Sequence, residues 1–262
     1  MKRVFVIFSV LCYFNTLNSQ TIDPLISEDF INQNKWVDSI YSSLSLDEKI
    51  GQLFFVQATG NKINNSEKIL NDIEEFKIGG LIFSTGNPSI QAKLTNDYQK
   101  LSTIPLLISM DAEWGVGMRL DSVPKFPWNM SLGAVVNDSI LEDIGSEIGN
   151  QFNRLGVHMN FAPVIDVNTN PNNPIIGNRS FGESKINVSN KGIRFTRGIQ
   201  SKNILATAKH FPGHGDSSKD SHLTLPTINF DEKRIKNVEL YPFKKLILQP
   251  ISSIVVLFFF AF

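Results

Sequence analysis

Residues 206–216 read Ala-Thr-Ala-Lys-His-Phe-Pro-Gly-His-Gly-Asp, a short apolar run that leads into a loop rich in glycine and charged groups. The stretch 106–115, Leu-Leu-Ile-Ser-Met-Asp-Ala-Glu-Trp-Gly, has the same organisation, and so has 158–170. A short apolar run bounded by turn residues is typical of a buried strand. We therefore expect polar side chains to follow the carboxyl ends of several strands, where the active sites of parallel α/β folds form.

The rest of the chain alternates in the same way between short apolar runs and longer amphipathic stretches. We expect strands at 52–57, 80–84, 106–110, 158–162, 206–210 and 251–257. We expect one helix to begin at 47–49, and further helices at 66–76, 89–101, 139–155, 185–202 and 231–246. The helix at 139–155 has an expected cap region at Asp138 and Ser139 and is ended by Gly156. Repeated strand–helix alternation predicts an α/β fold with a parallel sheet. About six strands can be found, fewer than the eight of a complete barrel.

The composition of the 262-residue chain is that of an ordinary globular protein. Apolar residues make up 42% and charged residues 19%, which excludes global disorder and a coiled coil. The 25 Lys and Arg residues balance the 25 Asp and Glu residues. This neutrality argues against a nucleic-acid partner bound through a basic surface, and it is compatible with a neutral ligand such as a sugar.

The amino-terminal segment differs from the middle of the chain. Residues 1–20 combine the basic start Met-Lys-Arg with a short apolar run, which is typical of a secretory signal peptide and predicts export to the periplasm or the cell exterior. A buried N-terminal strand is the alternative. The run is shorter than the roughly 20 residues of a stable membrane span. The only cysteine, Cys12, lies in this segment, so a mature chain would have neither disulfides nor a cysteine nucleophile.

The carboxyl-terminal segment is equally unusual. Residues 257–262 read Leu-Phe-Phe-Phe-Ala-Phe, with no turn signal, no helix cap and no polar tail. An exposed aromatic run of this kind promotes association. We interpret 257–262 as an apolar tail outside the domain, and we expect a truncation or a frameshift near Leu257.

The loop after 106–110 carries a candidate carbohydrate site. Asp111 and Glu113 follow the apolar run directly, Trp114 stands beside them, and Arg119 is close enough in sequence to reach the same pocket. Acidic groups beside an aromatic ring suit the binding of a sugar. Each acid could equally be a loop residue that caps the following helix.

The loop after 158–162 begins like a calcium loop, with Asp-Val-Asn-Thr-Asn at 166–170. Pro171 and Gly177 stand where such a loop needs glycine and glutamate, so we exclude calcium and expect Asp166 to organise the loop. Arg179 follows within Gly-Asn-Arg-Ser-Phe-Gly, which suits a guanidinium held out for bidentate hydrogen bonding. An ordinary surface arginine is the alternative.

Three of the four histidines fall within 210–222. A metal site is one interpretation of this cluster. However, Pro and Gly separate His210 from His214, so the two cannot share a helical face as they do in a His-Glu-x-x-His zinc site. We therefore expect no metal and no other cofactor.

Acid/base chemistry is the interpretation that we favour for the same loop. Asp220 stands just before His222 in a probable loop. A carboxylate that is hydrogen-bonded to an imidazole fixes its tautomer and raises its basicity, which makes a proton shuttle near neutral pH.

The motifs as a set resemble those of glycoside hydrolase family three. The resemblance rests on Lys-His-Phe-Pro-Gly-His-Gly-Asp at 209–216 followed by Asp-Ser-His at 220–222, and more narrowly points to the bacterial β-N-acetylhexosaminidases. Other motifs match in the family's order, namely Asp111, Arg119, 177–182 and 239–243. The likeness covers 36–256 and implies a (β/α)8 TIM-barrel domain, incomplete here with about six of eight strands.

The resemblance also implies an activity, namely retaining hydrolysis that removes terminal β-linked N-acetylglucosamine from peptidoglycan fragments or related glycans. His222 matches the acid/base and Asp220 its partner. Five residues match positions that hold the sugar in the −1 subsite: Asp111, Arg119, Arg179, Lys209 and His210. The family's aspartate nucleophile lies beyond the sixth strand, whereas the last acidic residue of this sequence is Glu239. We therefore expect this chain to lack the nucleophile and to be inactive as written.

Two alternatives to an active glycosidase remain open from the sequence. The first is a non-catalytic sugar-binding remnant, since all the matched subsite residues are present. The second is a metal-dependent hydrolase that uses His210, His214 and His222.

Overall fold

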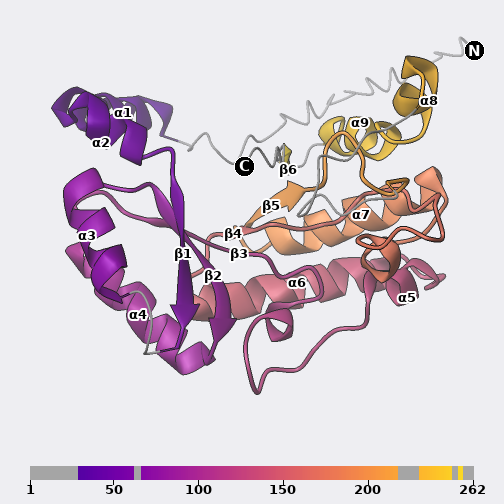
Figure 1. Ribbon diagram of the computed structural model, residues 1–262, viewed down its shortest axis with the longest axis horizontal. Helices are drawn as coiled ribbons and strands as arrows, with labels where there is room; N and C mark the ends of the chain where they lie inside the picture. Colours follow the sequence, from indigo (N-terminus) through magenta and orange to yellow (C-terminus); the bar gives the residue numbers. More distant parts are fainter. Residues whose placement is uncertain (1–28, 62–65, 218–229, 250–252, 256–262) are drawn as a thin grey trace, which may run out of the picture.

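The computed structural model describes residues 29–61, 66–217, 230–249 and 253–255, and it shows an α/β fold built on one parallel sheet (Figure 1). The six strands of the sheet are arranged in the order in which they occur in the chain. They are β1 (Phe55–Gly60), β2 (Gly80–Gly86), β3 (Leu107–Met110), β4 (Met159–Asn160), β5 (Leu205–Ala208) and β6 (Ser253–Val255). Parallel strands in sequential order, joined by helices, are the arrangement of a (β/α)8 barrel. The fold class is confirmed, with six of the eight strands among the described residues.

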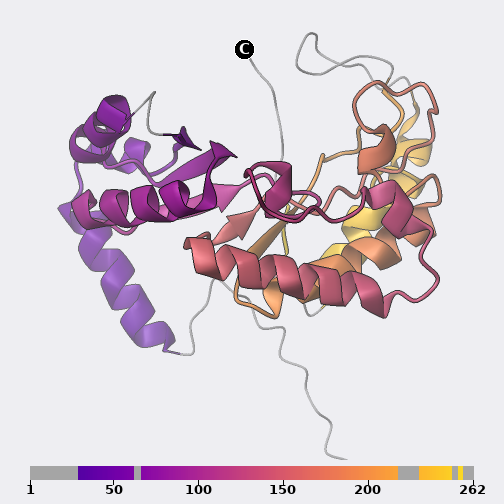
Figure 2. The same cartoon turned by 90° about the horizontal axis from the view of Figure 1, so that it is seen from below.

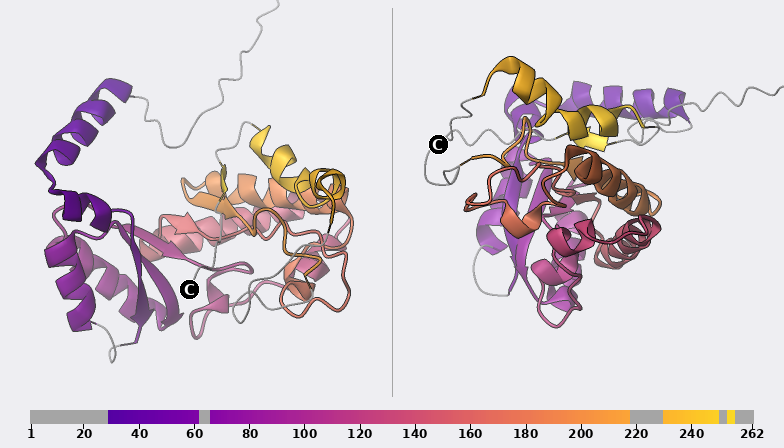
Figure 3. Two further views of the ribbon diagram at one scale, coloured as in Figure 1. Left: turned by 45° about the horizontal axis from the view of Figure 1, so that its top comes forward. Right: turned by 90° about the vertical axis from the view of Figure 1, so that its right-hand side faces the viewer.

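Helices separate most pairs of strands and cover the sheet. They are α1 (Phe30–Ser43), α2 (Leu46–Gly51), α3 (Ser66–Phe76), α4 (Pro88–Leu101), α5 (Asn129–Gly133), α6 (Ser139–Leu155), α7 (Lys185–Gln200), α8 (Glu232–Asn237) and α9 (Tyr241–Ile247), with single 3₁₀ turns at η1 (Val116–Met118) and η2 (Gly177–Arg179). Helices α3 and α4 lie beside β1 and β2, whereas α6 and α7 lie together beside β4 and β5 (Figure 1). Helix α1 extends away from the other helices (Figures 2 and 3).

Polar side chains cap the starts of several helices. Ser45 and Glu48 form a capping box at α2, in which the Ser45 side chain accepts from the Glu48 amide and the Glu48 carboxylate accepts from the Ser45 amide. Asn87 accepts from the first amides of α4, which begins with Pro88. Each of these bonds satisfies an amide that has no partner within its own helix.

Helix α6 begins at Ser139 with Asp138 at the N-cap position, as predicted, but another residue supplies the capping hydrogen bond. Asp138 precedes the helix but makes no capping bond with its side chain, and Asn137 accepts from the Ser139 amide instead. The Asp138 carboxylate pairs with Lys191 of α7. A strong ionic partner therefore replaces the local capping bond. The predicted end is confirmed, because Gly156 closes α6 in the left-handed conformation at φ 66°.

Close contact between α6 and α7 depends on small residues. A Cβ atom placed on Gly198 would lie 2.1 Å from the carbonyl oxygen of Glu142, and one on Gly145 would lie 2.4 Å from that of Phe195. The two backbones therefore approach more closely than any larger residue allows. This crossing buries Phe152 and Phe195 within the core between the helices and the sheet.

The first predicted strand and the last predicted helix need correction. The first strand is β1 at Phe55–Gly60 rather than 52–57, because the amides of Gln52, Leu53 and Phe54 bond back to the carbonyls that close α2. The predicted helix 231–246 is two helices, since α8 ends at Asn237, residues 238–240 form a turn, and α9 begins at Tyr241. Glu239 in this turn is buried. Helices α1 and α5 were not predicted. The predicted signal peptide 1–20 and the tail 257–262 lie outside the described residues.

The register of the sheet brings the carboxyl ends of the central strands together. Met110 of β3 pairs with Asn160 of β4, and Asn160 pairs in turn with Ala206 of β5. Beyond the strands, the Asn160 carboxamide bonds both backbone groups of Ala112, and Val164 forms a parallel bridge with Lys209. The loops that follow β3, β4 and β5 therefore start side by side. No helix in the described ranges is both long and apolar enough to cross a membrane.

Candidate functional site

Lys209 joins two carboxylates at the carboxyl ends of β3 and β5. Its Nζ lies 2.5 Å from Oδ1 of Asp111 and 2.8 Å from Oε1 of Glu113. The other oxygen of Asp111, Oδ2, accepts from Nη2 of Arg119 at 2.8 Å. Asp111 follows β3 directly and Lys209 follows β5 directly, so the parallel sheet itself brings these two side chains together.

Arg179 holds the second carboxylate from the other side. It donates from Nε to Oε2 of Glu113 at 2.9 Å and from Nη2 to Oε1 at 2.6 Å, which is a bidentate pair. The Glu113 side chain is completely buried. Burial by itself raises the pKa of Glu113, but the charges and hydrogen bonds of Lys209 and Arg179 outweigh it and lower that pKa to about 2. Glu113 is therefore an ionised group at neutral pH.

Asp166 holds the loop after β5, whereas the sequence predicted that it would organise its own loop after β4. Its buried carboxylate lies 2.6 Å from Nδ1 of His210, and it also accepts from the backbone amides of His210 and His214. Burial alone raises the pKa of Asp166, but the interaction with His210 and the amide hydrogen bonds lower it overall. A carboxylate that accepts from a loop in this way fixes both the backbone and the ring of His210.

Arg179 and Asp166 contact the two ring nitrogens of His210. Nη2 of Arg179 lies 3.2 Å from Nε2, and Oδ2 of Asp166 lies 2.6 Å from Nδ1. These two neighbours fix the orientation of the imidazole ring.

The site has a buried layer and a solvent-facing layer. The side chains of Glu113, Asp166 and Lys209 are at most 2% exposed. The side chains of the four other residues are 16–28% exposed, and these are Asp111, Arg119, Arg179 and His210. The buried layer has little freedom to move, and the outer layer presents one carboxylate, two guanidinium groups and an imidazole. Such groups, held in place, can donate to and accept from the hydroxyl groups of a sugar.

The structure therefore brings together all five residues predicted for the sugar subsite, Asp111, Arg119, Arg179, Lys209 and His210. It adds Glu113 and Asp166 as the buried anions that hold them. The ring of Trp114 packs against Trp128, with centroids 4.1 Å apart and the ring planes tilted by 43°. Glu113 lies in the turn that follows β3, and its position two residues after Asp111 had already made it a candidate for the same site.

Two further predicted residues cannot be placed. Asp220 and His222 lie outside the described residues, so their catalytic roles stay predictions. In the described ranges, no group of three or more His, Cys, Asp or Glu side chains is arranged to hold a metal ion. His210 and His214 are both present there, with ring centroids 6.1 Å apart.

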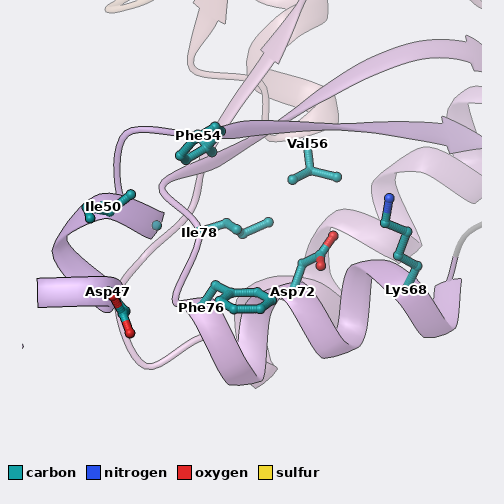
Figure 4. Close-up of a pocket in the computed structure, with 9 residues that line it drawn as sticks. Asp47, Ile50, Phe54, Val56, Lys68, Asp72, Phe76 and Ile78 are labelled. Carbon is teal, nitrogen blue, oxygen red and sulfur yellow. The ribbon is translucent and has the colours of Figure 1, made fainter. Parts of the chain in front are cut away.

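A separate pocket of about 420 Å³ lies at the opposite end of the sheet (Figure 4). Its lining comes from α2, α3 and the amino ends of β1 and β2, and includes Ile50, Phe54, Val56, Phe76 and Ile78. Lys68 and Asp72 stand at its side (Figure 4). Because it opens at the amino ends of the strands, it is distinct from the charged cluster at their carboxyl ends.

Comparison with known proteins gives, for most of the chain, the family that its sequence motifs resemble. Residues 45–258 match the Glycosyl hydrolase family 3 N terminal domain. The chain is 38% identical over 188 residues to Beta-hexosaminidase A of Pseudoalteromonas piscicida, covering 67% of this chain and 31% of that protein. It is 32% identical over 151 residues to Beta-hexosaminidase LpqI of Mycobacterium tuberculosis, covering 56% of this chain and 38% of that protein. The chain thus spans about a third of the length of these relatives.

Solved structures agree with the sequence relatives. A glycoside hydrolase family 3 β-N-acetylglucosaminidase from Paenibacillus sp. str. FPU-7 superposes with a TM-score of 0.74 at 36% identity, over 81% of this chain and 43% of that one. The β-glucoside phosphorylase BglX bound to 2FGlc superposes with a TM-score of 0.82 at 26% identity, over 90% of this chain and 42% of that one. The chain belongs to glycosyl hydrolase family 3, with the family's N-terminal domain matched at residues 45–258.

Proposed function

We propose that this chain provides the sugar-binding barrel of a retaining glycoside hydrolase that removes terminal β-linked N-acetylglucosamine. The single observation that carries the proposal is the fixed Asp111 carboxylate, held between Arg119 and Lys209 at the carboxyl ends of the strands. A carboxylate whose position is set by two cations is a strong acceptor for sugar hydroxyl groups. The hexosaminidase names of the relatives support N-acetylglucosamine as the sugar.

In the proposed mechanism the subsite residues bind and orient the sugar while Asp220 and His222 move the proton. Protonated His222 would donate to the oxygen of the departing group, and the Asp220 carboxylate would stabilise the imidazolium. In the second half of the reaction neutral His222 would accept a proton from the attacking water. Peptidoglycan fragments or related glycans are the proposed substrates, and export through residues 1–20 is proposed with them.

A retaining mechanism also needs a carboxylate that attacks the sugar carbon. The family resemblance puts this aspartate after the sixth strand, and the last acidic residue here is Glu239. Glu239 is buried and pairs with Arg234, so it is not proposed for the attack. We propose no nucleophile within this chain, and we expect it to bind the sugar more readily than it hydrolyses it.

The test separates binding from turnover. The purified chain is titrated with N-acetylglucosamine by calorimetry and is then incubated with a chromogenic β-N-acetylglucosaminide. We expect saturable binding that Asp111→Asn weakens by about tenfold or more, since a charge-assisted hydrogen bond contributes roughly 1.5–3 kcal/mol. Asp121→Asn, at an exposed position outside the charged cluster, is the matched control and should leave binding unchanged.

Three outcomes of this test have distinct meanings. Absence of binding in the wild-type chain overturns the proposal. Binding without hydrolysis favours the sugar-binding remnant over an active glycosidase. Formation of a sugar 1-phosphate in phosphate buffer would assign phosphorolysis in place of hydrolysis.

A further inference from the structure

Two tryptophan rings, Trp114 and Trp128, form an aromatic pair in the chain that follows the carboxyl end of β3. Their ring centroids lie 4.1 Å apart, and the ring planes are tilted by 43°. Trp128 is 47% exposed and Trp114 is partly exposed, so the pair presents apolar surface to solvent. Adjoining exposed aromatic rings, unlike single scattered ones, are typical of a binding surface.

The chain ties Trp114 to the charged cluster. Trp114 follows Glu113 directly, and the Glu113 carboxylate forms the bidentate pair with Arg179. The carbonyl oxygen of Trp114 accepts from the amide of Phe126 at 3.3 Å. Phe126 stands two residues before Trp128, so the returning loop brings the second ring to the first.

Trp128 is tied to the same arginine from the other side. It occupies the N-cap position of α5, and the next residue, Asn129, is 1% exposed. Nδ2 of Asn129 donates to the carbonyl oxygen of Arg179 at 2.8 Å. Helix α5 also packs closely on the chain after η2, because a Cβ atom on Gly133 would lie 2.0 Å from the carbonyl oxygen of Phe181. Each tryptophan is therefore one residue away from a side chain that contacts Arg179, on a backbone that is held in place.

The charged cluster and the aromatic pair suit different parts of a sugar. The cluster offers donors and acceptors, which hold hydroxyl groups. The indole rings offer apolar faces that carry partial negative charge. A β-linked N-acetylglucosamine ring has its substituents in equatorial positions, so both of its faces present C–H bonds with partial positive charge. Such a ring can lie flat on an indole.

Exposure rises from the cluster towards the aromatic pair. The Glu113 side chain is 0% exposed and that of Arg179 is 20% exposed, whereas Trp128 is 47% exposed. The pair therefore borders the cluster on its outer side, next to Arg179. A glycan whose terminal ring is held by the cluster continues outward, so its second ring is the one that this border can contact.

We propose that Trp114 and Trp128 form a second sugar subsite, on which the ring that follows the terminal β-linked N-acetylglucosamine stacks. The inference rests on the proposed function, because the cluster must hold the terminal ring. It gives the chain a preference for β-linked glycans of two or more sugars over the monosaccharide.

Calorimetric titration of the full chain compares two ligands. One is N-acetylglucosamine, and the other is the β-linked disaccharide diacetylchitobiose with sulfur in place of the bridging oxygen. The sulfur linkage resists hydrolysis, so the comparison neither needs turnover nor is disturbed by it. The wild type should bind the disaccharide about five- to tenfold more tightly, since aromatic stacking adds to the contacts of the terminal ring.

Trp128→Ala and Trp36→Ala are the matched variants. Trp36 is 53% exposed, but it lies on α1, which has no buried residue and extends away from the other helices (Figure 2). Trp128→Ala should lower the disaccharide affinity about five- to tenfold and leave the monosaccharide affinity unchanged. Trp36→Ala should change neither affinity. Trp128→Phe, which keeps an aromatic ring, should retain most of the preference for the disaccharide.

Tryptophan fluorescence provides a second measurement that leaves the pair intact. The chain has three tryptophans, so Trp36→Phe keeps only Trp114 and Trp128 as indole emitters. The sulfur-linked disaccharide should change their emission, with a midpoint equal to the calorimetric Kd. N-acetylglucosamine should saturate the cluster without that change. This measurement decides the role of the pair if Trp128→Ala fails to fold.

Equal affinity of the wild type for the two ligands overturns the second subsite and leaves the proposed function in place. An equal loss of both affinities in Trp128→Ala also overturns it, because the pair would then contact the terminal ring or only support the fold. So does an unchanged emission on saturation with the disaccharide. Absence of binding of either ligand overturns the proposed function, and the second subsite with it.

Discussion

Glu113 and Arg179 form a bidentate ion pair beneath the solvent-facing layer of the site, with Oε1–Nη2 at 2.6 Å and Oε2–Nε at 2.9 Å. Glu113 follows β3, and Arg179 ends the 3₁₀ turn η2. Because Glu113 also accepts from Lys209, this one carboxylate links the loops after three different strands. The geometry of the charged cluster therefore depends on a side chain that is itself 0% exposed.

Replacing the buried carboxylate should destabilise the whole fold. Glu113→Gln keeps the shape but removes the carboxylate that pairs with Arg179 and one of the two carboxylates that pair with Lys209. Because these ion pairs are buried, we expect the free energy of unfolding to fall by about 3–5 kcal/mol. Urea denaturation followed by circular dichroism measures it. The matched control is Glu142→Gln, whose pair with Arg194 is about 40% exposed on both sides. That variant should lose less than about 1 kcal/mol, and equal losses in the two variants would contradict the assignment.

The lowered pKa of Glu113 predicts a loss of stability in acid. A carboxyl group whose folded pKa is below its unfolded value stabilises the fold above the unfolded pKa, and this contribution is lost as pH falls through the folded pKa. For Glu113 the window runs from about pH 5 down to about 2, and the lowering from 4.5 to about 2 corresponds to about 3 kcal/mol. Asp166, whose pKa is also lowered, contributes with the same sign.

The measurement compares urea midpoints of the wild type and Glu113→Gln at pH 7, 5, 4 and 3. The glutamine variant cannot titrate at this position, so its stability should fall less steeply below about pH 5. Asp166 remains in both proteins and cancels in the difference. Parallel curves for the two proteins would show that Glu113 titrates normally in the folded state.

Lys191 should contribute more to stability than an exposed lysine with the same kind of partner. Its side chain is 2% exposed, and it donates to the Asp138 carboxylate at 2.5 Å and to the carbonyl of Val135. Lys191→Met removes two charge-assisted hydrogen bonds and should cost about 2 kcal/mol. Lys93→Met, which breaks an exposed pair with Asp97, should cost less than about 0.5 kcal/mol by the same denaturation experiment. If Lys191→Met leaves the free energy of unfolding unchanged, solvent and not Lys191 satisfies the Asp138 carboxylate.

Sugar binding should be independent of metal. The two ring nitrogens of His210 are directed at Asp166 and Arg179, so a cation at this histidine would have to displace one of them. Calorimetric affinity for N-acetylglucosamine should therefore be unchanged by a chelator and by added zinc. A loss of affinity in chelator that zinc restores would favour the metal-dependent alternative with His210, His214 and His222.

Several elements could be predicted from the sequence because their signals are local. The strands β2 to β5 follow from short apolar runs, and the left-handed end of α6 follows from Gly156. The break between α8 and α9 could not be predicted, because the stretch 231–246 keeps a helical pattern throughout. The break lies where Glu239 is buried, paired with Arg234 and packed against Gly213. Neither contact follows the spacing of a helix, so the helical pattern of the sequence does not predict it.

The sequence by itself determined the class of fold and the end of the sheet that bears the site. An apolar run followed by a charged loop can be recognised in a stretch of about ten residues. Sequential parallel strands bring their carboxyl ends to the same edge of the sheet. Through the family's motifs, the sequence also indicated the five residues that are proposed for the sugar subsite.

Only the tertiary structure decided which charges pair. Asp111, Glu113 and Asp166 are three similar carboxylates in sequence, yet Glu113 and Asp166 are buried and Asp111 is partly exposed. How deeply each carboxylate is buried, and which cation it pairs with, depend on how the loops after β3, β4 and β5 pack together. No local sequence pattern predicts that packing. The physical reason is that a buried ion is tolerated only where opposite charges and donors arrive from elsewhere in the chain.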